Sequence, residues 1–212
     1  KVKGYDLGIE LGLFNNRVNL NVDYYDKRTD GMLYAVNVPA ITGFTSTIEN
    51  IGVVRNRGVD VELYTRNLVG AFKWNTSFNV SRNKNEVVDL GGVDERINTL
   101  WSMGFLLRKG VPMFSYYGYK MIGVFQNDEQ ISKLPHLAGT KPGNPILLDV
   151  NDDGKIDPDN DRVILGNAMP KVVFGMANSF SYKKFDLSIT WQAAFGAKIF
   201  NAENQYYEGN TL

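Results

Sequence analysis

The 212-residue chain contains no cysteine and a single histidine, His136. The lack of cysteine excludes a disulfide framework and thiolate metal sites. With one histidine there is no histidine cluster, and a Ser-His-Asp triad would depend on one loop residue. No nucleophile and base converge in the sequence, so we do not expect an enzyme.

The chain also lacks a net charge and a long apolar run. Lys plus Arg and Asp plus Glu both number 23, so no large basic surface indicates binding to nucleic acid. An apolar run of about 18 residues, which a transmembrane helix needs, is absent. The start, KVKGYDLGIELG, has neither the charged region nor the apolar region of a signal peptide. We expect the chain to be an interior piece of a longer protein.

Residues 172–195 carry the clearest pattern that is present. Two arms alternate large apolar side chains with small or polar ones, and Lys183-Lys184 joins them. Period-two alternation places each set on one face of a strand. Arms of about ten residues can cross a bilayer at a tilt. A large apolar outer face and a small polar inner face are the reverse of a soluble sandwich, so we interpret these residues as one hairpin of an outer-membrane β-barrel.

This interpretation assigns side chains to lipid. The residues expected to meet lipid include Phe174, Met176, Leu187 and Ile189. A charge introduced at Leu187 is expected to cost about 2–4 kcal/mol near the bilayer midplane, and a charge at Ser188 is expected to cost little.

Two further hairpins are expected at about 4–25 and 58–81, with turns at Asn15-Asn16 and around 66–70. Asn tolerates the positive φ that hairpin turns need. Long connections, 26–50 and roughly 83–170, follow at the other end of the hairpins. Short periplasmic turns and long extracellular loops are typical of membrane barrels. Aromatic side chains expected in the interfacial girdles are Tyr24, Tyr25, Phe72, Trp74, Tyr182 and Phe185.

The sequence therefore predicts an all-β fold, an antiparallel up-and-down transmembrane β-barrel segment with a long extracellular loop region at 83–170. Six strands cannot close a membrane barrel, since the smallest have about eight, and open edges would leave unpaired backbone groups in hydrocarbon. The alternative is a soluble secreted β-sandwich that binds carbohydrate and is stapled by calcium.

The acidic stretch at 149–161 has the sequence DVNDDGKIDPDND, and its first nine residues match the first nine positions of a calcium-binding loop. Oxygen ligands stand at alternate positions, and Gly154 allows the sharp turn. The twelfth position, where a bidentate Glu belongs, is Asn160. The candidate Ca²⁺ ligands are Asp149, Asn151, Asp153, Lys155 through its carbonyl oxygen, Asp157 and Asp161. The alternative is a turn built from Asx side-chain hydrogen bonds without metal.

Six segments taken together resemble the SusC/RagA family of TonB-dependent outer-membrane transporters, in the family's order. They are VDYYDKRTDGMLY (22–34), ENIGVVRNRGVDVEL (49–63), WNTSFNVSRNKNEVVDL (74–90), GVPMFSYYGYKMIGVFQNDEQI (110–131), LLDVNDDGKIDPDNDRVILGNAMPKVVFG (147–175) and SFSYKKFDLSITWQAAFGAKIFN (179–201). The resemblance corresponds to a late portion of the barrel.

The resemblance implies a barrel of about 22 strands with a plugged lumen in the Gram-negative outer membrane. It implies a SusD-like surface lipoprotein as partner and lid, and energy from TonB through segments absent from this chain. The implied cargo is a glycan oligosaccharide or an oligopeptide. A siderophore or cobalamin receptor of the same architecture is the alternative, and the sequence indicates no ligand-contacting residues.

Overall fold

The computed structural model describes residues 1–37, 46–100 and 103–203. The chain divides into two units, described separately below. The sheet unit comprises Lys1–Glu95, Leu107–Met113 and Asn167–Ile199, and the loop unit comprises Arg96–Leu106, Phe114–Gly166 and the residues from Phe200 onward. Within the described residues, no helix has the length and hydropathy needed to cross a membrane.

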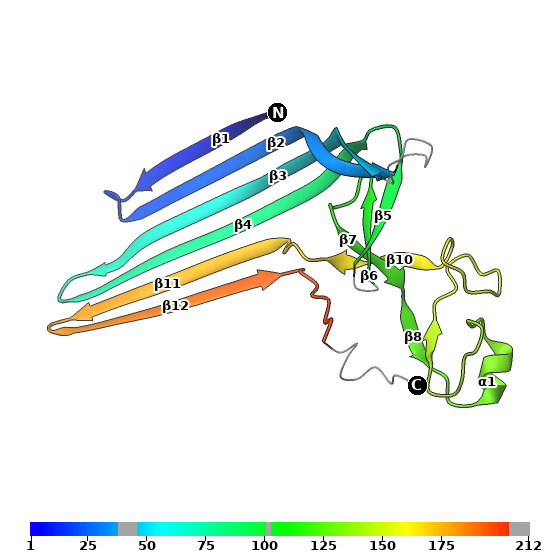
Figure 1. The fold of residues 1–212 in the computed structure, drawn as a ribbon. Helices are drawn as coiled ribbons and strands as arrows, with labels where there is room; N and C mark the ends of the chain where they lie inside the picture. The colour runs from blue at the N-terminus through cyan, green and yellow to red at the C-terminus, as the bar shows by residue number, and fades with distance from the viewer. Residues whose placement is uncertain (38–45, 101–102, 204–212) are drawn as a thin grey trace. The chain divides into compact units, whose positions relative to one another are not determined.

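The sheet unit is built on one six-stranded antiparallel sheet, in the order β1-β2-β3-β4-β11-β12 (Figure 1). Its strands are β1 (Val2–Leu13), β2 (Val18–Asn37), β3 (Ser46–Val69), β4 (Phe72–Leu90), β11 (Val172–Tyr182) and β12 (Phe185–Phe195). The hairpins expected at 4–25, 58–81 and 172–195 correspond to β1–β2, β3–β4 and β11–β12. The β4–β11 pairing joins the third hairpin to the other two across the long connection.

The register places the apolar residues of all six strands on one face. Residues that are direct partners across an antiparallel ladder share a face. One row of partners runs through Ile9, Val22, Val61, Val80, Phe174 and Ala193. The adjacent row, displaced by one residue, runs through Glu10, Asn21, Glu62, Asn79, Gly175 and Gln192. We call the face of the first row the apolar face and the other the polar face.

Large side chains on the apolar face are exposed rather than packed into a core. Leu7 is 65% exposed, Leu187 58% and Trp191 59%. A soluble sandwich must bury such side chains between two sheets, so the sandwich alternative is wrong. An exposed apolar surface of this kind is the surface that a membrane barrel presents to lipid.

The apolar face has the height of a bilayer core. β11 contains 11 residues, which at about 3.3 Å per residue span about 33 Å. A tilt of about 40° reduces this span to about 25 Å, the height of the apolar band of outer-membrane barrels. The two ends of β11, Val172 and Tyr182, therefore mark the two edges of the band.

Aromatic side chains gather at the Tyr182 edge of the apolar face, as expected. The Trp74 and Phe180 rings stack with centroids 5.8 Å apart, and the Phe72 and Phe180 rings with centroids 6.2 Å apart. At the other edge, the rings of Tyr5 and Tyr24 lie 6.2 Å apart. The girdle assignment of Tyr25 is wrong, because its row partners are Asp6 and Gly58, which place it on the polar face.

Asn178 is the one polar side chain among the large residues of β11, and the structure gives it partners. Its Oδ1 accepts hydrogen bonds from Trp74 Nε1 at 3.0 Å and from Thr76 Oγ1 at 2.7 Å. Both donors come from the neighbouring strand β4 on the same face. The amide oxygen is thus satisfied inside the apolar band, where an unpaired acceptor would cost several kcal/mol (about 2–7).

The loop expected over 26–50 is shorter than predicted, because β2 runs to Asn37 and β3 starts at Ser46. Apolar alternation stops near Tyr24 because the strands leave the apolar band there. Backbone pairing does not depend on that alternation, so the ladder continues.

The turns also differ in detail from the prediction. Asn15 and Asn16 have the expected positive φ of 55° and 60°, and Phe14 shares it at 53°. The second turn lies between Val69 and Phe72 rather than around 66–70.

The long connection is a folded region rather than an open loop, and β4 itself extends into it as far as Leu90. A four-stranded sheet has the order β10-β7-β6-β5, and β8 pairs with β9. Its elements are β5 (Glu95–Leu100), β6 (Met103–Arg108), β7 (Ser115–Tyr119), β8 (Met121–Val124), α1 (Asp128–Lys133), β9 (Pro145–Leu147) and β10 (Arg162–Asn167). The Asn127 side chain caps α1 by accepting from Gln130 N at 3.0 Å.

The face assignment predicts a difference between adjacent residues of β2. Leu20 lies in the apolar row of Met176, near the middle of the band, whereas Asn21 faces the polar side between Glu10 and Glu62. We expect Leu20→Arg to make folding into lipid vesicles less favourable by about 2–4 kcal/mol. Asn21→Arg should change this free energy by less than about 1 kcal/mol. Leu187 pairs with Phe180 close to the Tyr182 edge, so a charge there should cost less than at Leu20. Equal losses at Leu20 and Asn21 would contradict the assignment.

Candidate functional site: the polar face and the acidic loop

The polar face carries carboxylate and amide groups along the whole sheet. One row contains Glu10, Asn21, Glu62, Asn79 and Gln192, and the next contains Asp23, Asp60 and Ser81. In a barrel whose apolar face meets lipid, this face surrounds the lumen. It therefore supplies hydrogen-bond donors and acceptors to whatever passes through or fills the lumen.

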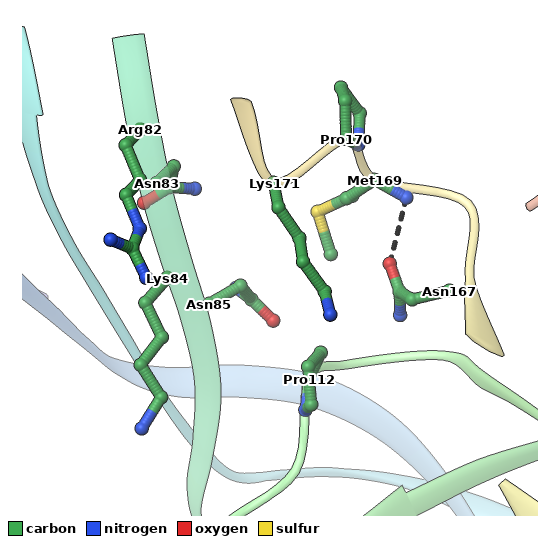
Figure 2. Close-up of a pocket in the computed structure, with 9 residues that line it drawn as sticks. All are labelled: Arg82, Asn83, Lys84, Asn85, Pro112, Asn167, Met169, Pro170 and Lys171. Atoms are coloured by element: carbon green, nitrogen blue, oxygen red, sulfur yellow. Dashed lines mark hydrogen bonds between the residues drawn. The ribbon is translucent and has the colours of Figure 1, made fainter. Parts of the chain in front are cut away.

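A pocket lies where β11 begins and β4 continues without it. Val172, the first residue of β11, pairs with Arg82. Beyond this pair a cavity of about 280 Å³ opens within the sheet unit, lined by Arg82, Asn83, Lys84, Asn85, Pro112, Asn167, Met169, Pro170 and Lys171. The Lys171 side chain extends into this space, toward Asn85 and Asn167 (Figure 2).

Two asparagine side chains fix one wall of the pocket by binding the backbone of Met113 from both sides. Asn85 Oδ1 accepts from Met113 N at 2.8 Å, and Asn167 Nδ2 donates to Met113 O at 2.8 Å. Asn85 Nδ2 also donates to Asn56 Oδ1 at 2.9 Å. This wall is therefore preorganised by side chains from β3, β4 and the end of β10.

Asn83 lines the pocket and has a buried amide oxygen. Its Oδ1 is buried and has no hydrogen-bond partner in the part of the chain that the structure describes. This oxygen points away from Lys171, and the amide nitrogen of Asn83 is on the Lys171 side (Figure 2). The pocket therefore offers the Lys171 ammonium as its charged donor, beside the side-chain amide of Asn83.

The sequence did not indicate this pocket. Asn83, Asn85, Asn167 and Lys171 fall within segments that carry the family resemblance, yet none has a motif of its own. The run SRNKN at 81–85 is polar at every position. A run without apolar residues indicates that this stretch neither faces the hydrocarbon of the bilayer nor packs in an apolar core.

The acidic loop is held by its own backbone N–H groups. Asp149 Oδ2 accepts from Gly154 N at 2.8 Å, and Asp153 Oδ1 accepts from Lys155 N at 2.9 Å. Hydrogen bonds from the Asn160 side chain, and then from the Asn160 and Asp159 backbone, lower the pKa of Asp157. Because this pKa lies below its unfolded value, the stabilisation is present above the unfolded pKa and is lost as the pH falls through the folded one.

Asp161 joins the two halves of the loop. Its side chain is fully buried. Oδ1 accepts from Val150 N at 2.9 Å and Oδ2 accepts from Asp157 N at 2.7 Å. One carboxylate therefore closes the loop from its start to its last turn, the role that the calcium prediction gave to a metal ion.

The loop contains the side-chain hydrogen bonds of Asx turns. Calcium takes six to eight converging oxygen ligands (about 2.3–2.6 Å from the ion), whereas these oxygens accept from amides along the loop. Among the described residues, no three acidic or histidine side chains are grouped to hold a metal. Calcium binding by Asp149, Asn151, Asp153, Lys155, Asp157 and Asp161 stays a prediction, which calorimetric titration of the intact protein with calcium decides.

The buried carboxylate predicts a specific weakness. We expect Asp161→Ala to expose the loop to proteolysis and to speed amide exchange at Val150 and Asp157, because both N–H groups lose a charged acceptor, and a hydrogen bond to a charged group contributes about 1.5–3 kcal/mol. Asp159→Ala, at an exposed position of the same loop, is the matched control and should change neither. Equal protection in both variants would contradict the stapling role of Asp161.

Comparison with known proteins places the chain among membrane receptors. A sequence profile described as "TonB dependent receptor-like, beta-barrel" matches residues 1–210. The chain is similar to TonB-dependent receptor P3 of Formosa agariphila, at 35% identity over 94% of this chain and 21% of that protein. It is also similar to TonB-dependent receptor SusC of Bacteroides thetaiotaomicron, at 26% identity over 94% of this chain and 20% of that protein.

The fold agrees with solved structures. The structure of the RagAB peptide importer in the closed-closed state superposes with a TM-score of 0.71 at 24% identity, over 92% of this chain and 21% of that chain. The chain thus spans about a fifth of the length of its relatives. Members of this family are outer-membrane receptors rather than enzymes, which confirms the expected location and the expectation that the chain is not an enzyme. With a profile match over nearly all its residues and strands in the matching arrangement, the chain belongs to the TonB-dependent receptor β-barrel family.

Proposed function

We propose that this chain forms part of the wall of a TonB-dependent transporter that imports glycan oligosaccharides or oligopeptides across the outer membrane. The observation that carries the proposal is the division of one continuous sheet into an apolar face and a face of acids and amides. The first suits lipid, and the second suits a hydrated passage.

The chemistry of the polar face favours a cargo rich in hydrogen-bonding groups. Glycans present hydroxyls and peptides present amides, and both can pair with carboxylates such as Glu10 and Glu62 and with amides such as Asn79. Similarity to SusC and to a peptide importer supports these two cargo classes. A siderophore or cobalamin receptor is the second candidate.

The proposed partners follow from the same similarity. A SusD-like surface lipoprotein would close over the extracellular mouth, and TonB would supply energy from the inner membrane. The extended ends of β2, β3 and β4 lie at the end of the sheet expected to be extracellular. That end is where a lid must dock.

Within the passage, we assign cargo contact to the pocket of Lys171 and Asn83. Lys171 reaches into the cavity with its ammonium, and the side-chain amide of Asn83 lies on the same pocket wall as Asn85. A hydroxyl or backbone carbonyl oxygen of the cargo can accept a hydrogen bond from this ammonium. The asparagine pair that holds Met113 keeps the pocket open for it.

Uptake by cells that carry the intact receptor tests the function. Deleting the receptor should abolish uptake of labelled oligosaccharide or oligopeptide and leave cobalamin uptake unchanged. Deleting TonB should also abolish uptake of the oligosaccharide or oligopeptide. Loss of cobalamin or siderophore uptake alone would support the second candidate and contradict the proposal.

The pocket is tested by substitution in the same cells. We expect Lys171→Ala to lower apparent affinity for cargo about tenfold or more, because a hydrogen bond from a charged donor contributes about 1.5–3 kcal/mol. Lys184→Ala, an exposed lysine in the turn between β11 and β12, is the control and should transport normally. If Lys171→Ala transports as well as the parent protein, the pocket does not contact cargo.

A further inference from the structure

Charged residues gather on the apolar face directly beyond its Val172 edge. The last apolar row contains Leu7, Tyr24, Val59 and Arg82. The next two rows outward on the same face contain Tyr5, Asp26, Arg57 and Lys84, and then Lys3, Arg28, Arg55 and Glu86. We call the cationic members, Lys3, Arg28, Arg55, Arg57, Arg82 and Lys84, the basic belt.

The basic belt holds more positive charge than its neighbours neutralise. Anionic side chains on this face pair with some members: Arg28 with Asp30 at 2.8 Å, Lys3 with Asp30 at 3.9 Å and Lys84 with Glu86 at 2.9 Å. Arg57 and Arg82 have no ion-pair partner among the described residues. In the three rows that contain the belt, six cations stand against the two anions Asp26 and Glu86, and the next row outward contains Asp30 and Asp89.

Arg55 is held in place at the centre of the belt. Asp26, only 6% exposed, accepts from Arg55 Nε at 2.8 Å and from its Nη2. This pair uses one side of the guanidinium and leaves Nη1 for another acceptor. A hollow of about 350 Å³ lies alongside, lined by Lys3, Gly4, Tyr5, Asp26, Arg28, Arg55 and Val88. The site therefore combines a fixed guanidinium with room for a small group.

The depth of the belt identifies what lies opposite it. The belt is at the end of the sheet with the long connections, which is the extracellular end of a barrel. Apart from Arg82, it begins one row beyond the last apolar row, about 7 Å further along the strands. The rings of Tyr5 and Tyr24 lie against each other where the belt meets the apolar rows, in the position of interfacial aromatics. The belt is therefore at the level of the outer-leaflet headgroups and on the side that faces them.

We propose that the basic belt binds the phosphate groups of the glycolipid of the outer leaflet, lipopolysaccharide. Arginine matches phosphate geometry with paired N–H donors, and several arginines beside a hollow can hold one phosphorylated headgroup. Arg82 and Lys84 also border the pocket, whereas Lys3, Arg28, Arg55 and Arg57 lie only on the face opposite the proposed passage, where cargo does not meet them. The lipid site is thus independent of the transport function.

Binding of lipopolysaccharide to the intact protein in detergent tests the proposal. Arg28→Gln/Arg57→Gln removes two belt charges and spares Arg82 and Lys84, which also border the pocket. We expect about thirtyfold weaker binding, since each cation near an anionic membrane surface contributes about 1 kcal/mol and about 1.4 kcal/mol is tenfold. Native mass spectrometry measures the bound fraction, and gel mobility before and after heating shows that each variant is folded.

The matched control removes the same charge from the other face. Lys27 and Arg66 lie on the polar face, so Lys27→Gln/Arg66→Gln should bind lipopolysaccharide as the parent protein does. Equal binding by the belt variant, or an equal loss in the control, would overturn the proposal. Equally tight binding of phosphatidylglycerol, lost in the same variant, would overturn the assignment to the glycolipid. Cargo uptake by the belt variant should stay normal, so this result is separate from the test of transport.

Discussion

Continuous backbone pairing across six strands is the constraint on which the structure depends. In hydrocarbon no water replaces a missing partner, so each N–H and C=O must be paired within the sheet. The ladder runs without a break from β1 to β12 because β4 and β11 pair although the folded connection separates them in sequence. The outer strands of this sheet need neighbours too, and six strands are fewer than the smallest membrane barrels have (about eight).

The register of this ladder decides what each face does. A slip of one residue between any two strands would exchange their faces and place acids such as Glu62 in lipid. Local devices help to hold the register. At Gly58, a Cβ would lie 2.5 Å from the Tyr25 hydroxyl. The Tyr25 side chain can therefore lie over position 58 on the polar face only because that residue is glycine. The Asn178 hydrogen bonds to Trp74 and Thr76 fix the register of β11 against β4 in the same way.

The sequence predicted the parts of the fold that the bilayer dictates. Apolar alternation in 4–25, 58–81 and 172–195 located the strands and their faces, because hydrocarbon imposes period two on the outward side chains. Outside the band this signal is lost: 26–37 and 46–57 are strand, although their charged residues follow no apolar period. The pocket was also missed, since Asn85 and Asn167 meet at Met113 only through the tertiary fold. In the acidic loop the spacing located the turn but not the buried role of Asp161, which depends on amides at two distant points of the loop.

Charge is distributed between the two faces at the extracellular edge in a way that hydrophobicity does not explain. On the polar face Lys27 is matched by Asp6 at 3.1 Å, so that cation adds little field to the lumen. On the opposite face Arg57 and Arg82 have no ion-pair partner among the described residues, and Arg55 is oriented by a buried carboxylate. If these cations served only solubility, either face would suit them equally, since both leave the apolar band at the same row. Their accumulation on the lipid side is accounted for when the leaflet opposite them carries phosphate.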